Sequence, residues 1–154
     1  MANQISQLNS GMPSIASMKG SVLWDDYGSV RKCGGTGQKW PLDACRRLVA
    51  LDDALDELPP GGPQEASECA KRIIGCYRAR DFVDVETFTM VLVATLARWP
   101  VPVMRMAACP FNGIVRKFKF PPSINEVADE LETIAANVRL LARSARRAVQ
   151  AELA

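Results

Sequence analysis

The chain has 154 residues, of which 48% are apolar, 23% charged and 6% aromatic, so it can bury one modest core, and we expect one domain with appendages and no second domain. Its 19 Lys and Arg against 17 Asp and Glu give a net charge of +2. That balance excludes a highly basic nucleic-acid-binding protein and an acidic disordered chain as descriptions of the whole. Because histidine is absent, we predict no catalytic residue, no metal site and no cofactor.

The five cysteines form no recognisable metal-binding or disulfide pattern. Their number is odd, none is spaced as Cys-x-x-Cys, and Cys45, Cys69 and Cys76 occupy apolar positions of predicted helices, so we predict reduced, buried thiols. The first residues lack a basic segment followed by a long apolar one, and no window holds the ~18 uncharged apolar residues of a membrane helix. We therefore expect a cytoplasmic protein without membrane contact.

Residues 1–39 are predicted to form a disordered arm. They are rich in Ser, Gly, Asn and Gln, and their few apolar residues follow no helical or strand period. From residue 40 onward the apolar residues recur at helical spacing. Residues 40–154 are therefore predicted to form a helical domain.

Three amphipathic helices are predicted first, over residues 41–58, 63–80 and 84–99. The segment Pro59-Pro60-Gly61-Gly62-Pro63 separates the first two, because it cannot continue a helix. A short fourth helix is predicted to begin at Pro102.

The third of these helices has a well-marked start. Asp84 is a suitable N-cap, and Val83 and Phe88 occupy the two positions of a hydrophobic staple. Apolar residues cover a wide part of the helix surface, so we expect it to be the most buried helix. After the Asn112-Gly113 turn, residues 114–120 have the pattern of an extended segment.

A long C-terminal helix has the strongest local signal. Pro121 and Pro122 disfavour helix before them, and Ser123 with Glu126 has the pattern of a capping box. Apolar residues then alternate three- and four-residue steps, as in a heptad seam, at positions 124, 127, 131, 134, 138, 141, 145 and 148. A homo-oligomer through residues 124–148 is therefore possible.

The predicted fold is all-α: a small helical bundle with a long C-terminal helix and a disordered N-terminal arm. The residues expected in its core are Leu48, Leu55, Ile73, Phe88, Leu92, Leu96, Trp99, Ile124, Val127 and Leu131.

Basic residues are the candidates for contacts with nucleic acid or a partner. Between Glu86 and Glu126 there is no acidic residue, and the segment Arg116-Lys117-Phe118-Lys119-Phe120 alternates cations with aromatics. Such a segment suits a surface that follows phosphates and stacks on unpaired bases. It equally suits a loop whose Phe118 and Phe120 point inward between solvated cations, and we favour that interpretation.

The end of the C-terminal helix carries four further arginines on the side away from its apolar seam. They are free to contact phosphates or an acidic partner, but a solvated face with favourable helix-end charge explains them without a ligand, and we favour that interpretation. In the predicted helix of residues 41–58, the adjacent residues Asp52 and Asp53 are expected to point in different directions, so their carboxylates should not converge on one site. The candidate contact residues are Arg105, Arg116, Lys117, Lys119, Arg139, Arg143, Arg146 and Arg147.

The stretch of residues 73–131 resembles the compact helical domain of bacteriophage and prophage replicative-helicase loader and inhibitor proteins. The resemblance lies in Tyr77-Arg78-Ala79-Arg80, in Leu96-Ala97-Arg98-Trp99-Pro100, and above all in Lys119-Phe120-Pro121-Pro122-Ser123-Ile124-Asn125-Glu126, which introduces a late helix. It implies a non-enzymatic accessory protein that binds a replicative helicase and either delivers it to the phage origin or blocks it. In such loaders a flexible segment contacts the helicase, whereas here the predicted arm is N-terminal.

Two alternatives belong to other classes. The chain could be an oligomeric DNA-binding regulator that dimerises through the seam of residues 124–148 and contacts phosphates with its arginines. It could also be an enzyme that uses a cysteine nucleophile, which requires a reactive thiol of low pKa.

Overall fold

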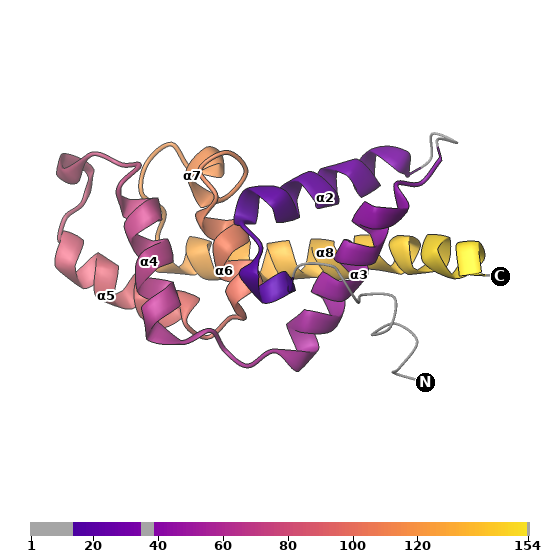
Figure 1. The fold of residues 1–154 in the computed structure, drawn as a ribbon. Helices are drawn as coiled ribbons and strands as arrows, with labels where there is room; N and C mark the ends of the chain where they lie inside the picture. Colours follow the sequence, from indigo (N-terminus) through magenta and orange to yellow (C-terminus); the bar gives the residue numbers. More distant parts are fainter. Residues whose placement is uncertain (1–13, 35–38, 154) are drawn as a thin grey trace.

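The residues that the computed structural model describes, 14–34 and 39–153, form helices and no strand (Figure 1). This confirms the predicted all-α bundle with a long C-terminal helix. In chain order the elements are the 3-10 turn η1 (Ile15–Ser17), α2 (Gly20–Cys33), α3 (Leu42–Glu57), α4 (Gly62–Ile74), the 3-10 turn η2 (Ala79–Asp81), α5 (Val85–Leu96), α6 (Val101–Ala108), α7 (Ile114–Lys117) and α8 (Ile124–Leu153).

Helix α8 runs along the length of the molecule and packs against α2, α3, α5 and α6 (Figure 1). Its start is the predicted capping box: the Ser123 backbone N–H donates to Glu126 Oε1 at 3.0 Å, and the Glu126 N–H donates to Ser123 Oγ at 3.2 Å. Val127, Leu131 and Ile134 of its seam are buried. The apolar seam is therefore covered by the other helices of the same chain.

Helix α6 lies at the centre of the bundle. Six of its eight residues are buried, and it contacts α2, α4 and α8. The prediction that residues 84–99 form the most buried helix is therefore wrong, because only Leu92 and Leu96 of α5 are buried. Of the ten expected core residues, Leu55, Phe88, Trp99 and Ile124 are partly buried against the core, and the other six are fully buried.

Helix α2 corrects the predicted disordered arm of residues 1–39. Residues 20–33 form a regular helix packed on α3 and α6, with Leu23 and Val30 in the core. The Trp24 indole N–H donates to the Met106 carbonyl at 2.8 Å, and the buried Asp26 pairs with Arg47 of α3. An acidic residue on the buried face breaks the apolar period, which hid this helix from the sequence argument. The rest of the arm, residues 1–13 and 35–38, lies outside the described residues.

Two local expectations around α5 and α7 also need correction. Asp84 caps α5 as predicted, since the N–H groups of Glu86 and Thr87 donate to its carboxylate at 3.1 Å each. Val83, however, is fully exposed, and Phe88 packs on the Phe82 ring at 5.2 Å between centroids, so the staple does not form. The segment predicted as extended, residues 114–120, begins with the helical turn α7.

Candidate functional site

Ion pairs divide the eight candidate contact residues into two groups. Arg105, Lys117, Arg139 and Arg146 each pair with an acidic side chain of another helix. The other four, Arg116, Lys119, Arg143 and Arg147, are exposed and have no ion pair within the part of the chain that the structure describes. Only this second group presents an uncompensated charge to a ligand.

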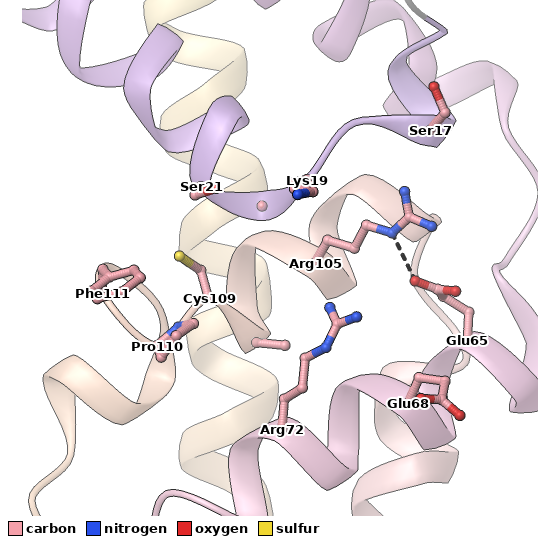
Figure 2. A pocket seen from close by; sticks show the side chains of 12 residues that line it. Ser17, Lys19, Ser21, Glu65, Glu68, Arg72, Arg105, Cys109, Pro110 and Phe111 are labelled. Atoms are coloured by element: carbon pink, nitrogen blue, oxygen red, sulfur yellow. Dashed lines mark hydrogen bonds and ion pairs between the residues drawn. The ribbon is translucent and has the colours of Figure 1, made fainter.

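Arg105 joins three elements (Figure 2). Its Nε donates to Glu65 Oε1 of α4 at 2.7 Å, and its Nη1 donates to the backbone carbonyls of Ala16 at 2.7 Å and Met18 at 3.2 Å. The contact with Glu65 joins α6 to α4, and the two carbonyl contacts hold the segment before α2 onto α6. Arg105 therefore stabilises the fold, and its charge is balanced by groups of the same chain.

A pocket of about 520 Å³ opens beside Arg105 between α2, α4 and the end of α6. In Figure 2 the Arg72 side chain extends toward the Arg105–Glu65 pair, and Lys19 lies across from it. Glu65 and Glu68 also line the pocket, so two carboxylates offset most of the charge of its three cations. This near balance gives the pocket no strong preference for an anion.

Arg139 and Arg146 connect α8 to the acidic end of α3. Arg146 Nη2 lies 2.9 Å from Asp53 Oδ1 and 3.2 Å from Asp52 Oδ2, so these two carboxylates converge on one guanidinium, contrary to the expectation from sequence. Arg139 binds both oxygens of Asp56, at 2.8 and 3.1 Å, and this hydrogen bonding lowers the pKa of that carboxyl group. Both arginines are used in helix packing.

The segment that alternates cations with aromatics is split between the core and the surface. Phe118 packs against the core, and its carbonyl accepts a hydrogen bond from the Tyr77 hydroxyl at 2.7 Å, as the inward-facing interpretation expects. Phe120 is exposed, contrary to that interpretation, and Lys119 Nζ lies 5.7 Å from its ring centroid. Lys117 pairs with Glu130 at 2.5 Å.

Arg147 lines a hollow that is not among the predicted sites, and Arg143 lies one turn earlier on the same side of α8. The hollow has a volume of about 650 Å³ and separates the start of α3 from the last turns of α8. Lys39, Trp40 and Arg147 line it together with Glu152. The sequence feature that could have indicated this hollow is the pair Lys39-Trp40 directly before a helix. The pair places a cation and an aromatic ring together at the edge of the domain.

Helix α5 lies at the opposite end of the molecule from this hollow (Figure 1), and it exposes the apolar side chains of Met90 and Val91. We call the α5 face the four residues Thr87, Met90, Val91 and Ala94, which recur at three- and four-residue steps and are all exposed. The side chain of Met90 is 66% exposed. Of the nine large apolar side chains that are exposed in the described chain, four lie within residues 83–91. The apolar residues that cover a wide part of the helix predict a mostly buried α5, so this face is not among the predicted sites.

Burial lowers the reactivity of two of the five cysteines. Cys45 and Cys69 are buried as predicted, whereas Cys76 is exposed. Burial raises the pKa of the Cys45 thiol and raises that of Cys69 to about 11, so both favour the unreactive thiol form. Within residues 14–34 and 39–153, no three His, Cys, Asp or Glu side chains are grouped to hold a metal ion.

Comparison of the chain with protein-family models, with curated proteins and with solved structures found no match. None of the helices in the described ranges combines the length and the apolar character needed to cross a bilayer.

Proposed function

We propose that this chain is a phage- or prophage-type accessory protein of DNA replication, which acts in the cytoplasm by binding a replicative helicase as a loader or an inhibitor. The motif of residues 119–126 supports this class of protein. The observation that carries the proposal is the exposed α5 face, which lies inside the same stretch, residues 73–131.

The α5 face has the properties of a protein-binding surface. Full burial of one Val or Met side chain contributes about 1.5–3 kcal/mol, and Met90, which is 66% exposed, and Val91, which is 37% exposed, gain only part of it in the isolated chain. A surface helix normally keeps its apolar residues on the side that faces the core. Helix α5 has apolar residues on both sides, Leu92 and Leu96 toward the core and Met90 and Val91 toward solvent, which favours a partner on the outer side.

Charges of both signs surround the α5 face, because Asp81, Asp84 and Glu86 directly precede Thr87. Arg98 follows Ala94 by four residues, Arg78 directly precedes η2, and Arg80 lies within η2. All three arginines are exposed, and none has an ion pair with another described residue. No acidic residue occurs from 87 to 125. A helicase segment with apolar side chains flanked by charges of both signs would complement this surface.

A pull-down with a purified replicative helicase tests the function. We expect the full chain to be retained at micromolar concentration, and the variant Met90→Gln/Val91→Gln to bind about tenfold more weakly, which corresponds to about 1.4 kcal/mol. Leu140→Gln is the matched control, because Leu140 is 65% exposed on α8, away from the α5 face. No retention of the unmodified chain would remove the proposed function.

The homo-oligomer through residues 124–148 has less support. Val127, Leu131 and Ile134 are buried by helices of the same chain, so a dimer through this seam would first have to open the bundle. Measuring the molecular mass in solution at two concentrations distinguishes the two functions, because only the oligomeric DNA-binding regulator requires self-association through this seam.

A further inference from the structure

The hollow beside Trp40 combines an aromatic ring with uncompensated positive charge. Trp40 is partly buried: it packs against the core and also lines the hollow. The volume of about 650 Å³ lies within the range of small-ligand sites and can accept a nucleotide. We propose that this hollow binds single-stranded DNA, with Trp40 stacking on one base and Lys39, Arg143 and Arg147 contacting the phosphates.

The charges that surround the hollow suit a phosphate backbone. Arg143 and Arg147 are four residues apart on α8 and therefore lie on the same side of the helix. Unlike Arg139 and Arg146, they have no ion pair with a described residue, so a phosphate does not have to displace an acidic partner. The hollow itself is lined by Lys39 and Arg147 against a single carboxylate, that of Glu152.

The ring of Trp40 favours a single strand over a duplex. Stacking on an aromatic side chain needs the free face of a base, which a base pair inside a duplex does not offer. Each such stack is worth about 1–3 kcal/mol, while the arginines supply a contribution that falls with salt. The two kinds of contact are therefore distinguishable by experiment. This site lies outside the α5 face and does not depend on a helicase.

The test is fluorescence anisotropy with a labelled oligothymidylate of about 15 nucleotides, titrated between about 50 and 200 mM salt. We expect Arg143→Gln/Arg147→Gln to weaken binding about tenfold at low salt and to lower the salt slope by about 1.4, because each phosphate contact on a single strand contributes about 0.7. Arg78→Gln/Arg80→Gln is the matched control, since it removes two exposed arginines at the far end of the molecule. That control should bind nearly as the unmodified chain does.

Trp40→Leu should weaken binding at every salt concentration without changing the slope. Because Trp40 also contacts the core, circular dichroism must show that this variant is folded, and the arginine pair provides an independent test. Three results would overturn the proposal: no binding by the unmodified chain at low salt, an equal loss in the Arg78/Arg80 control, or binding to a duplex as tight as to the single strand. None of them affects the helicase pull-down, so the two proposals fail separately.

Discussion

Asp26 and Arg47 form a two-point ion pair between α2 and α3. Arg47 Nε lies 2.8 Å from Asp26 Oδ2, and its Nη2 lies 2.9 Å from Oδ1, so one guanidinium binds both oxygens of one carboxylate. Asp26 is only 6% exposed and is the single buried charged residue in the described chain. The hydrogen bond with Asp26 raises the pKa of Arg47. The Asp26 carboxylate loses most of its hydration on folding, and its hydrogen bonds with Arg47 replace the lost hydrogen bonds with water.

Removing one member of this pair should destabilise the fold. We expect Asp26→Ala to lower the free energy of unfolding by about 2–3 kcal/mol, somewhat less than for a fully buried pair because the Arg47 side chain is 29% exposed. Urea denaturation measures the change. Asp25→Ala is the control, because Asp25 is exposed on the same helix and should change stability by less than about 0.5 kcal/mol. Equal effects of the two substitutions would contradict the role of the pair.

Two glycines of α2 should respond to alanine in opposite directions. A Cβ on Gly20 would lie 2.1 Å from the Arg105 carbonyl oxygen, a backbone atom that cannot move away cheaply, so Gly20→Ala should destabilise by about 1–3 kcal/mol. A Cβ on Gly28 meets nothing within 4 Å, so Gly28→Ala should stabilise the helix by about 0.5–1 kcal/mol. Thermal melts of both variants give the comparison. A stabilising Gly20→Ala would show that α2 is not seated against α6.

The capping box of α8 contributes to stability through two hydrogen bonds. Ser123→Ala removes the oxygen that accepts from the Glu126 N–H, and should cost about 1 kcal/mol in denaturant unfolding. Ser123→Asp keeps an acceptor at that position and should restore most of the loss. Asn125→Ala, an exposed change in the same turn, serves as the control. If Ser123→Asp lost as much stability as Ser123→Ala, the Ser123 hydroxyl would not stabilise α8 as a hydrogen-bond acceptor at the cap.

The buried thiol of Cys69 should make the fold sensitive to alkali. Its pKa is raised by burial from 9.0 to about 11, so the unfolded chain loses this proton more readily than the folded one. The associated stability is complete below about pH 9 and is lost as pH rises toward about 11. Denaturation at several pH values in this window should give a shallower decline for Cys69→Ala than for the unmodified chain. The exposed Cys76→Ala should leave the decline unchanged.

The sequence sufficed where a structural feature depends on neighbouring residues. The start of α8 was predicted from Ser123 and Glu126, and the cap of α5 from Asp84, because these hydrogen bonds form within one helical turn. The heptad spacing of residues 124–148 identified the side of α8 on which Val127, Leu131, Ile134, Val138 and Ala145 are buried. Local capping and apolar period together determined where the main helices of residues 40–154 lie.

The sequence did not suffice where a residue depends on a partner far along the chain. Asp26 is compensated by Arg47, and α2 was read as disordered because that pairing is tertiary. In the same way, Arg105 and Arg146 looked like free cations until Glu65 and Asp53 came next to them. For α5, an apolar pattern on two sides does not reveal which side the rest of the chain will cover. Packing of the helices therefore reduced the number of candidate contact residues, because it paired four of the eight basic residues with acidic side chains.

Helix α8 also works as a spacer. Its 30 residues rise about 1.5 Å each and so extend over about 45 Å, from the neighbourhood of α5 to the hollow beside Trp40. A continuous helix is stiff over this length and turns by about 100° per residue. The separation and relative rotation of the two ends are thus set by the number of residues in one uninterrupted rod. Two macromolecules held at those ends would be kept at a constant distance and orientation.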